Sequence, residues 1–308
     1  MATTLLICDP TSSWREWHQT QTANRDLLLL DPNDSQFGPP GQLRWIKNDQ
    51  VFDSQFFGSL DPLRFPQILL TALAEWLGRR EKSAQTNLII QLFPVRPSPA
   101  MRHLVLLIAQ LIKPTAIIVS ESLSMGLDGF PIGPQIIKLE KNYPEMVLAA
   151  QRKAQWLRLI EKTETHTISL STVTMGARLG SGMRVTTPEL VKVGIPEIVY
   201  AERQGSTLFV VTQEEISDRF VSRALDITHT RRIHMVRPTD YNDALVSFAR
   251  PSGEDFGLGT IQTVDWVAGT IIVKNTAAAP TPVALLKLGV IRIDSNGNER
   301  EEAKPWSI

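Results

Sequence analysis

The first half of the chain alternates short apolar runs with longer segments of helical periodicity, and this alternation limits the folds that it can form. Apolar runs of a few residues bounded by turn residues suit strands buried on both faces of a parallel sheet, and they are Thr3–Cys8, Leu27–Leu30, Leu43–Ile46, Leu88–Leu92 and Ala116–Val119. Apolar residues at helical spacing predict helices over Pro66–Arg80 and Pro99–Ile112. A further helix, which carries Arg152 and Arg158, is predicted over Pro144–Lys162. Strands alternating with helices through short connections predict right-handed crossovers and an α/β layered fold.

After about residue 165 the pattern changes to short β-like runs separated by clusters of Gly, Pro, Asn and Asp. These runs are Val199–Ala201, Thr207–Thr212, Ile233–Val236, Ala244–Ala249, Thr260–Val267, Thr270–Lys274, Val283–Leu288 and Val290–Ile293. Short strands with turn signals between them are typical of antiparallel sheets. We therefore predict two domains, an α/β domain over residues 1–165 and a mostly antiparallel, β-rich domain over residues 166–308.

The composition supports two cores and excludes several classes of protein. Hydrophobic residues make up 43% of the 308 residues, and 32 basic residues balance 32 acidic ones, so net charge indicates neither nucleic-acid nor membrane binding. A local basic groove remains compatible with this balance. Cys8 is the only cysteine, which excludes an intrachain disulfide and a thiolate metal cluster. No apolar window is long enough to span a bilayer and the N-terminus lacks a signal peptide, so we expect a soluble, cytoplasmic protein without a membrane partner.

The segment between the first strand and a candidate helix has the context of a phosphate-binding loop but not its residues. A P-loop needs two glycines so that backbone amides can wrap the phosphates, a lysine that neutralises them, and a hydroxyl that holds magnesium. Here Asp9 and Trp14 replace the glycines, Arg15 replaces the lysine and Glu16 replaces the hydroxyl residue. Each change opposes triphosphate binding, and an ordinary strand-to-helix turn is the alternative interpretation.

Other segments, in order along most of the chain, resemble the RNA 5′-hydroxyl kinase family, which includes kinases of the messenger-RNA cleavage complex and of ribosomal-RNA processing. Asp31, Gln36 and Pro39-Pro40-Gly41 are similar to the signature that follows the second strand in this family, whereas Asn33 and Ser35 depart from it. Further segments that resemble the family are Phe56–Pro62, Leu111–Thr115, Gly176–Gly182, Val199–Arg203, Ala244–Gly259 and Val283–Glu299.

The resemblance implies a P-loop-NTPase-like parallel sheet with flanking helices and a lid-like helix near residues 144–162. It implies that Asp31 is the residual catalytic base and that the lid arginines are Arg152 and Arg158. The nucleotide-binding positions that it implies, all degenerate, are Ser13, Arg15, Glu16 and Gln36. Because phosphoryl transfer depends mostly on positioning and charge neutralisation, the altered loop indicates a degenerate member of this family. The segments Gly176–Gly182 and Val199–Arg203 resemble its prokaryotic members.

Three functions remain open at this point. The first is a pseudokinase that serves as a binding or scaffolding module for RNA or a protein partner and needs no cofactor. The second is an active RNA 5′-hydroxyl kinase that uses ATP and Mg²⁺ through an atypical loop. The third is a regulator that senses a nucleotide without transferring phosphate. The sequence favours the first, because all four defining positions of the P-loop are altered.

Several of these residues also allow plainer interpretations. Asp31, followed by Pro32, could simply end a strand, and Arg15 could be a solvated helix residue. Trp14 and Trp17 could stack on a base if they are exposed, although tryptophans more often pack in a core. We expect structural roles and no metal site for the histidines, which lack metal-ligand spacing; they are His18, His103, His166, His229 and His234. A short basic cluster is interpreted as a solvated face rather than an RNA contact; it comprises Arg231, Arg232, His234 and Arg237.

Overall fold

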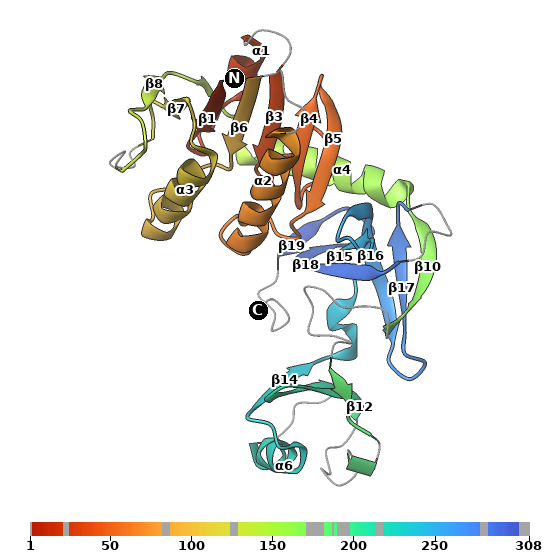
Figure 1. Cartoon of the computed structure of the whole chain (residues 1–308). Coiled ribbons are helices and arrows are strands. Elements are labelled where there is room, and N and C mark those ends of the chain that lie inside the picture. The colour runs from red at the N-terminus through yellow and green to blue at the C-terminus, as the bar shows by residue number, and fades with distance from the viewer. Residues whose placement is uncertain are drawn as a thin grey trace. The chain divides into compact units, whose positions relative to one another are not determined.

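The computed structural model describes residues 2–20, 25–81, 87–123, 129–170, 182–186, 188–189, 198–213, 218–277 and 283–301. The chain divides into two compact units, Met1–Trp156 and Leu157–Ile308 (Figure 1), and each is described by itself. This division falls within helix α4 (Glu145–Glu161), and the predicted domain boundary after residue 165 stays a prediction. Most of the Gly176–Gly182 segment of the family resemblance, and Trp306, lie outside the described residues.

The first unit is built on a seven-stranded sheet in the order β5-β4-β3-β6-β1-β7-β8 (Figure 1). Its strands are β1 (Thr3–Ile7), β3 (Arg25–Leu30), β4 (Gln42–Lys47), β5 (Gln50–Phe56), β6 (Asn87–Leu92), β7 (Ala116–Ser120) and β8 (Gln135–Ile137). From β3 to β8 in the sheet order, neighbouring strands are parallel, as predicted. Because β1 lies between β6 and β7, the chain changes direction across the sheet beside β1, which is where open α/β sheets bind their ligands.

One edge of this sheet departs from the predicted parallel arrangement. The predicted run Leu43–Ile46 forms β4, which is antiparallel to β3, and β5 then adds an antiparallel edge strand that the sequence did not predict. Asn48 and Asp49 join the two strands with φ angles of 49° and 56°. Two adjacent residues with positive φ make the tight turn whose twist matches a β-hairpin. The antiparallel pairing of β4 and β5 follows from this turn, because a two-residue connection allows only an antiparallel pair.

The helices of the first unit agree with the predicted ones and are α1 (Arg15–Thr20), α2 (Pro66–Glu81), α3 (Pro99–Ile112) and α4. Helices α2 and α3 lie side by side on one face of the sheet (Figure 1). The ends of α3 show why it forms where it does. The Ser98 hydroxyl accepts a hydrogen bond from the backbone N–H of Met101 at 3.1 Å, and Lys113 ends the helix in the left-handed conformation, with φ of 47°.

The second unit contains the predicted β-rich architecture in two sheets. A six-stranded antiparallel sheet has the order β10-β17-β16-β15-β18-β19, and a four-stranded sheet has the order β11-β12-β13-β14. The strands are β10 (Glu164–Ser169), β11 (Met183–Arg184), β12 (Ile198–Gln204), β13 (Thr207–Thr212), β14 (Arg232–Val236), β15 (Ala244–Ala249), β16 (Asp255–Asp265), β17 (Thr270–Asn275), β18 (Leu285–Ile293) and β19 (Glu299–Glu301). A 3-10 helix, η2 (Pro238–Tyr241), connects the two sheets along the chain.

Two details of the second unit differ from the predictions. Helix α6 (Asp218–Thr228), which the sequence pattern did not reveal, joins β13 to β14 and makes this pair parallel. Its residues Phe220, Ala224 and Ile227 pack in the apolar cluster of the four-stranded sheet. The two predicted runs from Val283 to Ile293 form the single strand β18, because Gly289 continues the strand instead of ending it.

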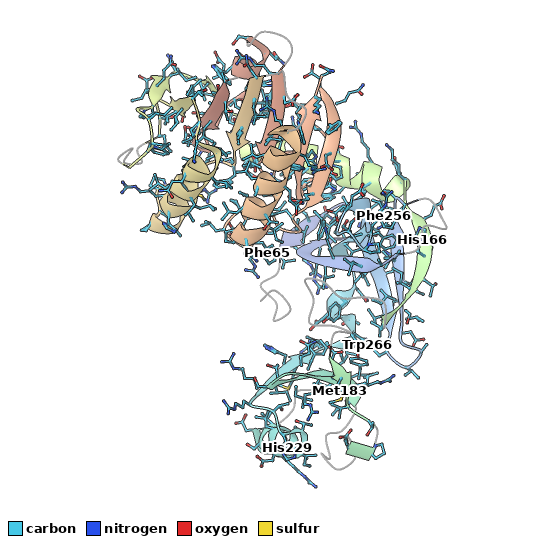
Figure 2. All side chains as sticks on the ribbon, viewed as in Figure 1. Phe65, His166, Met183, His229, Phe256 and Trp266 are labelled. Atoms are coloured by element: carbon cyan, nitrogen blue, oxygen red, sulfur yellow. The ribbon has the colours of Figure 1, made fainter. Side chains whose placement is uncertain are left out.

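Aromatic and histidine side chains in the second unit have structural positions (Figure 2). Trp266 is 3% exposed, and its ring lies 5.7 Å from that of Tyr241 in the core. The ring of His166 packs edge-on against Phe248 at 5.5 Å. His229 is exposed just after α6, where its φ is 53°. None of the helices described is long and apolar enough to cross a membrane.

Candidate functional site

The loop between β1 and α1 is organised around the carboxylate of Asp9, which is 7% exposed. Its Oδ1 accepts hydrogen bonds from the backbone N–H of Thr11 at 2.7 Å and from the Thr11 hydroxyl. Its Oδ2 accepts from the hydroxyls of Ser12 at 2.6 Å, of Ser120 at 2.9 Å and of Ser122. A P-loop directs its donors at phosphate, whereas these donors surround an anion that belongs to the loop itself.

The pKa of Asp9 is well below its ordinary value. Burial alone would raise this pKa, because it disfavours the charged form, but hydrogen bonds from Ser12, Ser122 and Thr11 outweigh the effect of burial. Asp9 is therefore ionised at neutral pH. A phosphate group that approached the same donors would be repelled by this charge.

The backbone of the same loop is held by a second segment of the chain. Ser12 and Ser13 form β2 (Ser12–Ser13), which pairs with β9 (Glu140–Lys141) in an antiparallel ladder. The carbonyl of Thr11 accepts a hydrogen bond from the N–H of Asn142 at 2.8 Å. Ser13, a predicted nucleotide-binding residue, is 9% exposed, and its hydroxyl lies 3.4 Å from the backbone nitrogen of Arg15, which donates to it.

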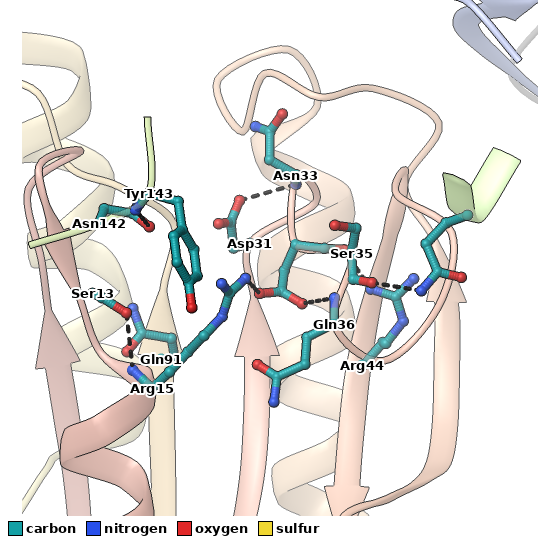
Figure 3. Close-up of polar contacts among 12 residues, drawn as sticks. Ser13, Arg15, Asp31, Asn33, Ser35, Gln36, Arg44, Gln91, Asn142 and Tyr143 are labelled. Atoms are coloured by element: carbon teal, nitrogen blue, oxygen red, sulfur yellow. Dashed lines mark hydrogen bonds and ion pairs between the residues drawn. The ribbon is translucent and has the colours of Figure 1, made fainter. Parts of the chain in front are cut away.

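Arg15, which stands in the position of the P-loop lysine, reaches the loop that follows β3 (Figure 3). Its Nη2 lies 3.5 Å from Oδ2 of Asp34, and the side chains are 20% and 3% exposed. The other oxygen of Asp34 accepts from the backbone N–H of Gln36 at 2.8 Å. The guanidinium also lies 5.9 Å from the centre of the Tyr143 ring, within the range of a cation–π contact. Arg15 is thus held by protein groups at the end of β3.

Asp31 lies half-buried at the end of β3, and its pKa is raised to about 7. Burial is the main cause, and the negative charge of Asp34 adds to it. A hydrogen bond from the N–H of Asn33 at 3.0 Å and the positive charges of Arg15 and Arg152 act in the opposite direction. A carboxyl group that titrates near neutral pH is suited to accept or release a proton, as a residue predicted to be a base requires.

The raised pKa of Asp31 predicts a pH dependence of stability. Between about pH 4 and 7 the folded protein holds this proton more tightly than the unfolded chain, so the free energy of unfolding falls as pH rises through this range. The asparagine side chain in Asp31→Asn cannot ionise, so this variant is expected to lack this part of the dependence of the free energy of unfolding on pH. Urea unfolding of both proteins at about pH 5 and pH 8 measures it. If the free energies of unfolding of the wild type and of Asp31→Asn differed by the same amount at both pH values, the raised pKa would be contradicted.

Of the two predicted lid arginines, Arg152 lies close enough to Asp31 to lower its pKa. The Arg152 side chain is 12% exposed, and its Nη2 lies 3.0 Å from Oε1 of Glu145, a residue whose side chain is 77% exposed. Arg158 is exposed on the same helix, six residues further along, which places it on a different face. Of the two arginines, only Arg152 is among the charges that shift the pKa of Asp31, and the lid role of both stays a prediction.

The remaining predicted nucleotide-binding residues, Glu16 and Gln36, have exposed side chains. Glu16 lies in the first turn of the short helix α1, and Gln36 takes part in the site through its backbone N–H, which binds Asp34. Among the residues that the structure describes, no group of three or more His, Cys, Asp or Glu side chains could hold a metal ion.

Arg44 is a site residue that the sequence analysis missed. Its side chain is only 1% exposed; Nη1 donates to the carbonyl of Asp34 at 3.1 Å and Nη2 to that of Pro39. Burial lowers the pKa of Arg44 to about 10, so the guanidinium is charged at neutral pH. It therefore fixes the loop that carries Asp31 and Asp34. An arginine inside the apolar run Leu43–Ile46 was the signal that could have identified it.

Gln91 and Cys8 form a buried polar pair at the end of the central strands. Gln91 is 2% exposed; its Nε2 donates to the carbonyl of Leu92 at 2.6 Å, and its Oε1 has no hydrogen-bond donor within the described part of the chain. Burial raises the pKa of the Cys8 thiol to about 12, a hydrogen bond with Gln91 lowers it, and the charges of Asp9 and Asp31 raise it further. The thiol is therefore protonated and unreactive at neutral pH.

Trp14 is a core residue rather than a stacking platform, which corrects one of the alternatives that the sequence left open. It is 8% exposed and packs with Leu6 and Ile89 of the sheet, and Trp17 is partly buried against the same cluster. The aromatic ring that does lie exposed at the site belongs to Tyr143, with 55% of its surface accessible. Because Trp14 is tightly packed, its side chain cannot move aside to leave the space that a glycine leaves in a P-loop.

Comparison with known proteins adds a fold relationship to this geometry. No family model matches the sequence, and no curated protein matches it. Two solved structures of Clp1p superpose on 94% of the chain with a TM-score of 0.52, at 10% and 11% identity, covering 75% and 74% of the Clp1p chains. The chain has the Clp1p fold. One of these structures concerns an extended interface between Pcf11p and Clp1p and ATP loss in a glycine-to-arginine point mutant, and the other is a complex of wild-type Clp1p with a Pcf11p segment.

The similarity to Clp1p covers both parts of the architecture, an α/β unit with a mostly parallel sheet followed by mostly antiparallel β sheets. Because the sequences are only 10% identical, the similarity between this chain and Clp1p is one of fold alone. The chemistry of the site rests on the residues of this chain, and at the end of β1 they differ from a P-loop at every defining position.

Proposed function

We propose that this protein is a catalytically degenerate relative of the polynucleotide 5′-hydroxyl kinases that acts as a binding or scaffolding module. The observation that carries the proposal is the buried, ionised carboxylate of Asp9 at the centre of the β1–α1 loop. Its oxygens use the loop donors that a triphosphate would need, and its charge opposes the approach of phosphate.

The other parts of the loop support the same proposal. The cation of Arg15 is paired with Asp34 after β3, and Trp14 fills space in the core. Pairing of β2 with β9 engages backbone groups that a P-loop leaves available for phosphate. Phosphoryl transfer depends on wrapping amides, a compact cation and a metal-binding hydroxyl, and this loop supplies none of the three in its usual place.

Clp1p provides an analogy for a protein of this fold whose interactions extend beyond ATP. Its solved complexes contain Pcf11p, a protein partner, and a single glycine-to-arginine change in it is associated with loss of ATP. By this analogy, a chain that lacks the loop glycines would keep partner binding while losing the nucleotide. RNA or a protein of an RNA-processing assembly is the partner that this role implies.

The proposal predicts no phosphoryl transfer. The purified protein is incubated with Mg²⁺, labelled ATP and an oligoribonucleotide that has a 5′-hydroxyl, and transfer of label is expected to stay at the level of the blank. In a thermal-shift experiment, millimolar ATP is expected to raise the melting temperature by about 1 °C or less, because only a ligand that binds the folded state stabilises it.

The matched variant for this assay is Arg15→Ala. Label transfer by the wild type that disappears in Arg15→Ala would contradict the proposal and establish an active kinase. A large thermal shift with ATP and no transfer would instead support the nucleotide-sensing regulator. Polynucleotide retention that weakens steeply as salt is added would support the binding module, because displaced counterions make such binding salt-dependent.

One observation favours the second candidate, an active kinase with an atypical loop. Asp31 has a pKa of about 7 and lies near two arginines, which is the environment of a general base. In an active enzyme Asp31→Asn would abolish transfer and leave oligonucleotide binding intact. The same variant separates this candidate from a purely structural role of the Asp31 carboxyl group.

A further inference from the structure

Strand β14 forms one edge of the four-stranded sheet in the second unit (Figure 1). Among the residues that the structure describes, it pairs on one side only, with β13, and the two strands are parallel. The backbone N–H of Arg232 donates to the carbonyl of Ser206, just before β13, at 3.2 Å. Because successive residues of a strand direct their backbone groups to opposite sides, the N–H and C=O groups of Ile233 and Met235 are directed away from β13. A further strand could bind to these groups.

This edge strand is held at both ends by the rest of the second unit. The N–H of Arg231 also donates to the carbonyl of Ser206, at 2.7 Å, and the N–H of Arg237 donates to the carboxylate of Asp240 at 2.9 Å. Between these ends, all five residues of β14 are in register with β13. An edge that is already ordered loses little conformational entropy when a partner binds to it.

The edge is also strongly basic, although the chain as a whole has no net charge. Arg231 directly precedes β14, Arg232 begins it and Arg237 directly follows it, and all three residues are exposed. No acidic residue lies between Arg231 and Arg237 in the sequence. Like charges oppose the pairing of this edge with another copy of itself, whereas opposite charges on a neighbouring strand stabilise pairing.

The two faces of β14 present different side chains to an added strand. Arg232 lies on the same face as Val236, and Ile233 and Met235 lie on the opposite face. Ile233 packs against the apolar cluster of the four-stranded sheet, and Met235 beside it remains 38% exposed. Residues that lie directly opposite each other in neighbouring strands share a face of the sheet. A strand in which acidic and apolar residues alternate would therefore bring acids to Arg232 and apolar side chains to Met235.

We propose that the basic edge, defined as β14 with Arg231 and Arg237, binds an extended segment of a partner protein in which acidic and apolar residues alternate. The bound segment adds a fifth strand to the sheet. A polynucleotide also carries negative charge, but it lacks the peptide N–H and C=O groups that complete a β ladder. The inference goes beyond the proposed function, because it concerns the second unit and holds whether or not the β1–α1 loop binds a phosphate.

The test measures the fluorescence anisotropy of labelled peptides with the full-length protein. The first peptide has about eight residues, the length of an ordinary strand, with glutamate and valine in alternation. The second has lysine in place of glutamate, and the third is the glutamate peptide with N-methyl groups on all its inner backbone nitrogens. We expect the first peptide to bind at least about tenfold more tightly than either of the others. N-methylation keeps the charge and removes the backbone donors, so it separates strand addition from attraction between charges.

Two changes at the edge test the two parts of the recognition. The double variant Arg231→Glu with Arg232→Glu should reverse the preference, so that the lysine peptide binds more tightly than the glutamate peptide. Met235→Pro removes an N–H that is directed away from β13 and should weaken binding of the glutamate peptide about tenfold. Proline is tolerated in an edge strand where the N–H does not face the neighbouring strand, so this variant should still fold.

Lys274→Glu is the matched control, because it reverses an exposed charge on β17 of the other sheet and should leave the affinity for all three peptides unchanged. The inference would be overturned if the double variant kept the preference for glutamate. Equal affinity for the glutamate peptide and its N-methylated form, or binding of none of the three peptides, would overturn it as well.

Other occupants of the edge have results of their own. An oligoribonucleotide that displaces the labelled peptide more strongly than the unlabelled glutamate peptide does would assign the basic edge to a nucleic acid and overturn the inference. Self-association of the protein that disappears in Met235→Pro would assign it to a second copy of the chain, with the same consequence. Label transfer from ATP would overturn the proposed function alone, so the two can fail separately.

Discussion

Asp9→Ala is expected to lower the free energy of unfolding by about 3 kcal/mol, because it removes the acceptor of several buried donors at once. The hydroxyls of Ser12, Ser120 and Ser122 and the N–H of Thr11 would lose their shared partner. The depressed pKa of Asp9 shows that its surroundings favour the charged carboxylate over the protonated form. Urea unfolding of wild type and variant at neutral pH measures the difference.

The pH profile gives the control for this effect. A carboxyl group with a lowered folded pKa contributes stability above its unfolded pKa of about 4, and this contribution is lost as the pH falls towards the folded pKa. The difference in the free energy of unfolding between the wild type and Asp9→Ala should therefore become smaller at acidic pH. Ser122→Ala, which deletes a single donor, should cost about 1 kcal/mol. An Asp9→Ala protein as stable as the wild type at neutral pH would contradict the hydrogen-bond account of the loop.

Arg44→Met is expected to reduce the free energy of unfolding by about 3–5 kcal/mol, the range found when one partner is removed from a buried charged network. Methionine keeps much of the apolar stem but has no donors. The carbonyls of Asp34 and Pro39 would lose the guanidinium, and the carboxylates of Asp31 and Asp34 would lose a neighbouring buried cation. The urea midpoint reports the loss of stability.

Arg96→Met serves as the matched control, because Arg96 is exposed in the same unit and its replacement should change stability by less than about 0.5 kcal/mol. Arg44→Lys should lie between the two, since an ammonium can replace part of the donor set but cannot reproduce the fork. Equal stability of Arg44→Met and Arg96→Met would mean that the loop after β3 is fixed by its own turns and not by the buried guanidinium.

The parallel strands and the long helices could be predicted from the sequence because their signals are local. β3 and β6 are nearly continuous apolar runs, and α3 has Ser98, Pro99 and Lys113 at its ends. β5 could not be predicted in the same way, because the sequence Gln50–Phe56 has little apolar alternation and its pairing depends on the turn at Asn48. Helix α6 was missed because it lies among β-like runs, and its amphipathic pattern spans only eleven residues.

Part of the site could be predicted from the sequence, because some of its residues occupy motif positions. Asp31, Arg15 and Arg152 were identified from motif positions, and both arginines are among the charges that lower the pKa of Asp31. Asp34 and Arg44 could not be identified from the sequence, because their roles depend on tertiary contacts. The burial of Trp14 likewise depends on packing against residues distant in sequence, so its side chain could not be placed from the loop pattern alone.

The ladder between β2 and β9 has a consequence for the mobility of the start of α4. Asn142 binds the carbonyls of Thr11 and Pro10, at 2.8 and 3.3 Å, and α4 begins three residues later. The first turn of α4 is therefore tethered and could not swing outward without rupturing these bonds.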